Sequence, residues 1–430
     1  MISISNCSVK ISGNTFNDAA GMMYENVAIT TNGGASIISN NNFNSCGLNL
    51  SDNSTISNNV IGGGMGIYGG SPFISNNTIS GGSSYFFIGR DWDRDYYTVA
   101  IEDQSSPTLT GNTIGSIAFN MNGNGYMYNI FNALITGNII TGGIGIGGGT
   151  GTVVISNNII SGAGVSGGSA VSTTINNNLI ININIGLQIG DAIVENNTIA
   201  NCSTAIQLNS AVSPIISGNN IENYSQHSIQ LVSTSNNINA PNNWWGTTNQ
   251  QAINQSIYDL KNDFNLGKVN FLPILNSPNP NAPEIPTFTL STSAGTGGSI
   301  SPSGPLIVIY GNSQIFNITA NTGYHIVDVE VNGTSVGAVT SYAFNNIQAS
   351  YVISATFASN TSPSPTSSQT PTSSSTPIPT ATAAATIYSP TASPSETPAI
   401  PELAPLAIII LLAGALLAII GIKKQKSKKS

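Results

Sequence analysis

Residues 38–43 read Ile-Ser-Asn-Asn-Asn-Phe, and the same six-residue box recurs along the first half of the chain. The box has an aliphatic residue, then Ser, Thr, Asn or Glu, then Gly or Asn, then Asn, any residue, and Ile or Phe. Where no insertion intervenes, its Asn returns every 18 to 22 residues, which indicates stacked repeats rather than a globular core. The box places Asn at Asn14, Asn41, Asn59, Asn77, Asn112, Asn138, Asn158, Asn178, Asn197 and Asn219.

A repeat of this length suits three short strands and three turns. The aliphatic residue and the final Ile or Phe are expected to point inward, and the Asn side chains to stack as a hydrogen-bonded structural ladder. A second strand follows in most repeats, as in Leu48–Leu50, Leu187–Ile189 and Ile206–Leu208. The sequence therefore predicts an all-β fold, a right-handed single-stranded parallel β-helix over residues 1–275.

The end of the stack carries capping signals. Asn243 continues the register, with Trp245 at the inward position. Ile253, Ile257, Leu260 and Phe264 follow at helical spacing, which predicts an amphipathic helix. Residues 269–273 (Val-Asn-Phe-Leu-Pro) predict a final strand. A bulky Trp and a helix would together cover the open edge of the last coil.

These boxes resemble the repeats of right-handed β-helix proteins of the pectin-lyase-like and NosD-like families, over about 265 residues. The segment Asn242-Asn-Trp-Trp-Gly246 resembles the closing coil found in those proteins. The resemblance implies the fold, but the fold hosts lyases, glycosidases, adhesins and binding proteins alike.

The sequence after residue 275 indicates five further segments. Residues 276–287 are a Pro-rich linker, and residues 288–358 a small all-β module with a hairpin turn at Asn332-Gly333. Through residues 298–302, 323–326 and 355–357 the module resembles the divergent internalin-type B repeat of cell-surface proteins. Residues 359–402, rich in Ser, Thr and Pro, predict a disordered stalk. Residues 403–422 predict a transmembrane helix, and residues 423–430 a basic cytoplasmic tail.

Membrane anchoring follows from that order of parts. The Lys residues after the apolar run place the C-terminus in the cytoplasm and the β-helix outside, at the cell surface. Pro401-Glu-Leu403 with the span and basic tail resembles archaeal sorting signals of the Pro-Glu-Phe type, although Leu403 replaces the Phe. The chain begins with strand-like alternation instead of a signal peptide, so we expect the native protein to start upstream.

Charge and cysteine content exclude several classes of protein. Residues 1–402 hold all 18 acidic residues and 5 of the 10 basic ones, giving 5 − 18 = −13, which disfavours nucleic acid as a partner. Cys7, Cys46 and Cys202 are expected to be small buried fillers, and Cys46 and Cys202 lie too many coils apart to bond. His227 is expected in a turn. Two His and three Cys are too few for a transition-metal site.

Aromatic and acidic residues concentrate between Ile79 and Ile101, where the chain is much longer than one coil needs. The intervals 16–27 and 114–135 are long as well. Rings stack on sugar faces and carboxylates accept hydroxyl hydrogen bonds, so these loops predict a carbohydrate site. The alternative is that the rings pack on the coil surface. The predicted sugar ligands are Tyr85, Phe86, Trp92, Tyr96, Tyr97, Tyr126 and Tyr128.

A Ca²⁺ site is a further hypothesis for the longest loop. Asp91, Asp93, Asp95 and Glu102 have the 1, 3, 5, 12 spacing of a calcium loop. Tyr96 replaces the Gly expected at position 6, and Arg90 and Arg94 offer salt bridges as the alternative.

No set of residues specifies a reaction, and no catalytic residue is assigned. The sequence favours a membrane-anchored surface protein that displays a β-helix for adhesion or carbohydrate binding. A surface polysaccharide lyase or glycoside hydrolase remains open, since acidic loops supply paired carboxylates. A structural surface-layer component without a ligand remains open too.

Overall fold

The computed structural model describes residues 2–17, 27–81, 98–102, 104–119, 130–147, 150–167 and 171–360, with only the backbone at Ile130 and Phe131. Two compact units divide the chain, residues 1–362 and 363–430, and every described residue belongs to the first. The predicted stalk, transmembrane segment and basic tail lie outside the described residues. Within the described residues no helix has the length and apolar character needed to cross a bilayer.

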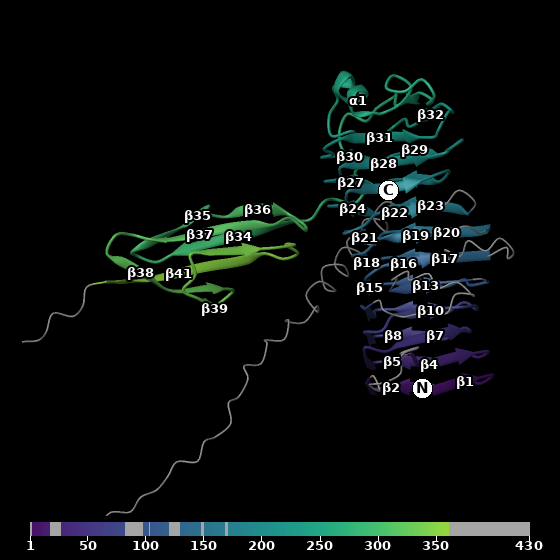
Figure 1. Ribbon diagram of the computed structural model, residues 1–430, viewed down its shortest axis with the longest axis horizontal. Coiled ribbons are helices and arrows are strands. Elements are labelled where there is room, and N and C mark those ends of the chain that lie inside the picture. The colour runs from purple at the N-terminus through teal and green to yellow at the C-terminus, as the bar shows by residue number, and fades with distance from the viewer. Residues whose placement is uncertain are drawn as a thin grey trace, which may run out of the picture. The chain divides into compact units, whose positions relative to one another are not determined.

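Three long parallel sheets build residues 2–232 into a parallel β-helix, in which each coil adds one strand to every sheet (Figure 1). The first sheet contains β1 (Ile2–Ser5), β4 (Val27–Asn32), β7 (Gly47–Ser51), β10 (Met65–Ile67), β13 (Val99–Ile101), β16 (Ile117–Phe119), β19 (Ile144–Ile146), β22 (Val165–Gly167), β25 (Ile185–Ile189), β28 (Thr204–Asn209) and β31 (His227–Val232). The second contains β2 (Lys10–Ser12), β5 (Ile37–Ser39), β8 (Thr55–Ser57), β11 (Phe73–Ser75), β14 (Thr108–Thr110), β17 (Ile130–Thr136), β20 (Thr150–Ser156), β23 (Ser172–Asn176), β26 (Ile193–Glu195) and β29 (Ile215–Ser217). The third contains β3 (Thr15–Asn17), β6 (Asn42–Asn44), β9 (Val60–Ile61), β12 (Thr78–Ile79), β15 (Thr113–Ile114), β18 (Ile139–Ile140), β21 (Ile159–Ile160), β24 (Leu179–Ile181), β27 (Thr198–Ala200) and β30 (Asn220–Glu222).

The six-residue box accounts for one corner of every coil. Its aliphatic residue lies in the second sheet and its Ile or Phe in the third, and both belong to the continuous core, as Ile155 and Ile160 do without any exposure. The residue before each ladder Asn has positive φ, for example +55° at Asn157 and +66° at Gly137. This left-handed conformation explains why the box accepts only Gly or Asn there.

Beyond β31 the stack ends in a cap, shown at the teal-green end of the β-helix in Figure 1. Trp245 is 1 % exposed and its ring meets Phe271 edge-on, with centroids 6.2 Å apart. The short strands β32 (Ile238–Asn239) and β33 (Val269–Asn270) pair in parallel. Trp245 is therefore buried at the predicted inward position, and the final strand is shorter than the predicted 269–273.

The predicted cap helix over residues 253–264 was wrong in length. Helix α1 (Gln250–Ser256) begins at its N-cap Asn249, and Ile257 is already extended. Tyr258 then forms a bridge with Gln230 of β31, so pairing with the sheet replaces the next helical turn. Leu260 and Phe264, which the spacing placed on the buried helix face, are 43 % and 91 % exposed.

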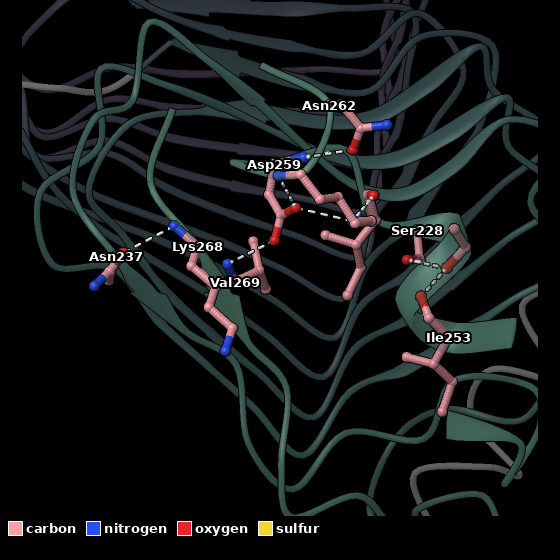
Figure 2. Close-up of polar contacts among 10 residues, drawn as sticks. Ser228, Asn237, Ile253, Asp259, Asn262, Lys268 and Val269 are labelled. Atoms are coloured by element: carbon pink, nitrogen blue, oxygen red, sulfur yellow. Dashed lines mark hydrogen bonds and ion pairs between the residues drawn. The ribbon is translucent and has the colours of Figure 1, made fainter. Parts of the chain in front are cut away.

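Asp259 makes the polar contacts that fix the segment following α1 (Figure 2). Its Oδ2 accepts from the backbone N of Val269 at 3.0 Å, and its Oδ1 lies 2.9 Å from Nζ of Lys261. Because Asp259 is buried, these bonds fix the loop that carries β33 against the last coil.

Two predictions about single residues need correction. Cys46 and Cys202 are buried as expected and form no disulfide, but Cys7 is exposed because it lies in the turn after β1. His227 is the first residue of β31 rather than part of a turn, and it pairs with Thr204 of β28.

Residues 287–359 form two further sheets around a separate core that includes Leu290, Phe316 and Val329. One has the order β36-β34-β41-β38-β39 and the other β35-β37-β40. Asn332 and Gly333 both have positive φ and join β38 to β39, which confirms the predicted hairpin. The strands are β34 (Thr287–Ala294), β35 (Gly298–Ser301), β36 (Leu306–Ile309), β37 (Gln314–Ala320), β38 (Tyr324–Val331), β39 (Thr334–Gly337), β40 (Ser341–Phe344) and β41 (Tyr351–Ser359).

Candidate functional site

The buried Asn of the ladder hydrogen-bond one another and neighbouring backbone carbonyls. Oδ1 of Asn158 accepts from N and Nδ2 of Asn138, at 2.9 and 3.0 Å. Nδ2 of Asn158 donates to the carbonyl of Ile135 and to Oδ1 of Asn178, both at 2.9 Å. The same pattern links all ten predicted Asn and continues to Asn243, where Oδ1 accepts from Asn219. From Asn41 onward these buried amides have no capacity left for a ligand, so the ladder is structural as predicted.

The outer face of the first sheet presents one side chain per coil. Val99 and Ile101 point into the core, whereas Ala100 between them does not belong to it. Alternation along the strand therefore places Ala100 on the outer face. The residues paired in register with Ala100 form a row along the sheet. Its middle residues are Gly and Ala, and its last three, toward the cap, are Gln. The row is Thr30, Asn49, Gly66, Ala100, Ala118, Gly145, Ser166, Gln188, Gln207 and Gln230.

The long intervals of the sequence are anchored at both edges of this sheet. The intervals 18–26 and 82–97 separate β3 from β4 and β12 from β13, so both leave the corner between the third and first sheets. The interval 120–129 separates β16 from β17 and leaves the opposite edge, toward the second sheet. Ala100 and Ala118 lie in the strands next to the intervals 82–97 and 120–129, and the small residues from Gly66 to Gly145 are all buried.

Most of the predicted ligand-binding residues lie outside the described residues. These are the proposed sugar ligands Tyr85, Phe86, Trp92, Tyr96, Tyr97, Tyr126 and Tyr128, and the proposed calcium ligands Asp91, Asp93 and Asp95. Glu102 is described, and it follows β13 directly with its backbone N donating to the carbonyl of Ile67 at 2.8 Å. In the described parts of the chain, His, Cys, Asp and Glu side chains form no group of three that could hold a metal ion.

A cluster of amide and aromatic side chains at the cap end of the same face was not anticipated. Gln207 donates through Nε2 to Oδ1 of Asn209 at 3.1 Å. The His227 ring lies against Tyr258, with centroids 5.5 Å apart and planes tilted by 58°. Gln188, Gln207, Gln230, His227 and Tyr258 are all half-buried. The sequence does show a Gln between two aliphatic residues in three consecutive strands, which indicates a row of Gln. The position of Tyr258 beside that row could not be predicted, because residues 253–264 were expected to form a helix.

Burial makes one cysteine chemically inert. Desolvation raises the pKa of Cys202 from 9.0 to about 11, against a smaller lowering by a backbone hydrogen bond from Ile183. A thiol with such a pKa stays protonated near neutral pH, so Cys202 is unsuited to act as a nucleophile. Burial likewise raises the pKa of Tyr310 in the small module.

No protein family, curated protein or solved structure matches this chain.

Proposed function

We propose that the chain is a membrane-anchored cell-surface protein whose right-handed β-helix binds carbohydrate along the outer face of the first sheet. The observation that carries the proposal is the arrangement of that face. Its central row is reduced to Gly and Ala where the two longest insertions are anchored, and it becomes a row of Gln toward the cap. A linear chain of sugar rings would lie parallel to the axis of the coils.

The chemistry of the flanking side chains suits sugars. Amides donate and accept hydrogen bonds, which matches hydroxyl groups, and aromatic rings pack against the apolar faces of pyranose rings. The described face supplies Gln207, Gln230 and Tyr258, and the interval 82–97 carries Phe86 and Trp92 in its sequence. Asp91, Asp93 and Asp95 with Glu102 would hold Ca²⁺ beside this face if the spacing acts as a calcium loop.

Anchoring rests on the sequence of residues 359–430. The Ser/Thr/Pro stalk, the apolar run over residues 403–422 and the five Lys after it support display outside the cell with a cytoplasmic C-terminus. The likeness of the boxes to pectin-lyase-like and NosD-like repeats, and of the module to the internalin-type B repeat, agrees with a surface protein. The same likeness also allows a polysaccharide-degrading enzyme, so the assay must separate binding from cleavage.

The test is a glycan array probed with the full chain in mild detergent, once with Ca²⁺ and once with a chelator. We expect binding that a Gln207→Ala variant weakens by about tenfold, since one or two hydrogen bonds to the sugar are lost. A Val60→Ala variant on the outer face of the third sheet is the matched control and should bind normally. Loss of binding under chelation would support calcium at residues 91–102.

Several outcomes would count against the proposal. Undiminished binding by a variant that lacks residues 82–97 would exclude that interval as a sugar site. Release of new reducing ends from the bound polysaccharide would favour a lyase or glycoside hydrolase. Absence of binding to any glycan would favour a structural surface-layer role. Resistance of the β-helix to protease added to intact cells, when the purified protein is cleaved, would contradict display outside the cell.

A further inference from the structure

The outer face of the second sheet carries two straight rows of side chains. In each strand a core residue, such as Ile74 or Leu109, has one outward residue before it and one after it. The first row is mainly apolar and reads Lys10, Ile37, Thr55, Phe73, Thr108, Leu134, Val154, Thr174, Ile193 and Ile215. The second is mainly hydroxyl and reads Ser12, Ser39, Ser57, Ser75, Thr110, Thr136, Ser156, Asn176, Glu195 and Ser217.

Exposed apolar side chains gather on this face. Ile37, Phe73, Leu134 and Ile215 are 44, 45, 37 and 50 % exposed, and all four belong to the first row. The third sheet differs, because the linker after the cap lies against its outer face. There, the backbone N of Asn279 donates to Oδ1 of Asn220, and the carbonyl of Pro283 accepts from the hydroxyl of Thr198. Half-buried residues such as Thr55 and Thr108 separate them along the row. Exposed apolar side chains that collect on one face are typical of a protein contact surface.

Charge on this face occurs only near its two ends. Of the twenty side chains in the two rows, Lys10 in the first coil and Glu195 in the ninth are the charged ones. Lys10 is exposed and Glu195 is half-buried. A second copy of the chain fits this pattern when its axis runs antiparallel, because coil one of each copy then faces coil nine of the other. Both Lys10 residues would then meet a Glu195, whereas parallel axes would leave both pairs unformed.

We propose that two copies of this chain associate through the second sheets, face to face and antiparallel, about a two-fold axis at Thr108 of the fifth coil. Such an interface is isologous, so every contact occurs twice. The apolar row of one copy lies on that of the other, with Phe73 opposite Leu134 and Thr108 opposite itself. Lys10 reaches Glu195 diagonally between the rows, which long side chains allow across packed sheets.

The size of the face sets the strength of association. Ten strands about 4.8 Å apart and three residues wide cover roughly 40 Å by 10 Å. Each copy therefore contributes less than the about 800 Å² per partner of a standard interface. We expect a weak dimer that forms at high local concentration, as on a crowded surface, rather than an obligate one.

Charge reversal in the full chain, held in mild detergent, tests the antiparallel pairing by sedimentation. Lys10→Glu alone and Glu195→Lys alone should each raise the dissociation constant by about tenfold, because both pairs become repulsive. The double variant K10E/E195K should restore the original value. An equimolar mixture of the two single variants should also restore association, since the heterodimer forms two opposite-charge pairs. Equal association of all these samples would overturn the proposal.

A cross-link at the two-fold axis tests the face itself. In a Cys7→Ser background, Thr108→Cys should join to its own copy through a short bismaleimide. Ile215→Cys at the end of the row and Val60→Cys on the third sheet are matched exposed controls and should not. Efficient linkage of V60C instead of T108C, or a monomer at the highest soluble concentration, would show that another surface or none is used.

Discussion

At the scale of single residues, the box owes its two Asn-rich positions to different forces. The position before the ladder needs a left-handed backbone, and Asn tolerates it as Gly does, which is why Asn157 at φ +55° and Gly137 at φ +66° are interchangeable. The ladder position instead needs a side chain with a donor and an acceptor at fixed reach, and only an amide supplies both. The sequence separates these roles because the position before the ladder alternates between Gly and Asn, as at Gly137 and Asn157, whereas the ladder position is always Asn.

The loss of stability on substituting a ladder Asn should depend on whether that Asn lies inside the ladder or at its end. Asn158→Ala removes the acceptor of two Asn138 donors and the donor to the Ile135 carbonyl, all of them buried. We expect a loss of about 3 kcal/mol or more in the free energy of unfolding, since each orphaned group costs about 1–3 kcal/mol. Urea denaturation of the full chain followed by circular dichroism measures it.

Asn14→Ala is the matched control for that experiment. Asn14 begins the row, is exposed, and donates to Asn41 without accepting from any ladder Asn among the described residues. Its removal should cost less than about 1 kcal/mol, because water replaces the lost bond. Equal losses at Asn14 and Asn158 would mean that ladder burial does not determine the stability.

At the scale of elements, the cap shows where pattern reading fails. The spacing of Ile253, Ile257, Leu260 and Phe264 satisfies a helix, yet α1 ends at Ser256. Sheet pairing of Tyr258 and the buried bonds of Asp259 stabilise another conformation, and neither is visible in a helical period. Tertiary pairing here outweighs a local preference of a few tenths of a kcal/mol per residue.

Asp259→Ala should loosen the cap without disturbing the coils. Val269 N would lose its acceptor while buried, and Lys261 would lose its ion pair. We expect hydrogen exchange at residues 257–271 to become at least about tenfold faster, with unchanged exchange in the ladder coils. Asp263→Ala is the control, since the carboxylate of Asp263 accepts from the exposed Asn265 and from no buried group among the described residues. Faster exchange throughout the β-helix would contradict a local role for Asp259.

At the scale of the whole molecule, the contacts that stabilise the fold are mainly between uncharged groups. Only 7 % of the residues are charged, and Lys261–Asp259 is the one ion pair within the described ranges. Stability is then carried by the apolar core and the amide ladder, whose energies salt hardly screens. The long parallel sheets also mean that each coil contacts mainly the coils beside it.

Thermal unfolding of the full chain should therefore change little with ionic strength. Raising NaCl from low concentration to about 0.5 M should move the midpoint by no more than about 2 °C, because surface charge pairs are few. Scanning calorimetry measures this, with K10E as a charge variant that should unfold at the same temperature as the parent. A large drop in the midpoint with salt would reveal ion pairs that the described residues do not contain.

The sequence by itself determined the coil: its length, its inward residues, its Asn ladder and its Trp cap all follow from contacts between residues adjacent in the box or one period apart. Only the tertiary structure decided what the outer face of the first sheet displays. The hydroxyl row of the second sheet is the second position of the box, but the row on the first sheet depends on the register between strands separated by insertions of different lengths, which no local pattern encodes. It also decided that the interval 120–129 leaves the opposite edge of the first sheet and that α1 stops at Ser256. The physical reason is that core packing repeats identically in every coil, whereas surface rows and caps arise once, from strand pairing over the whole stack.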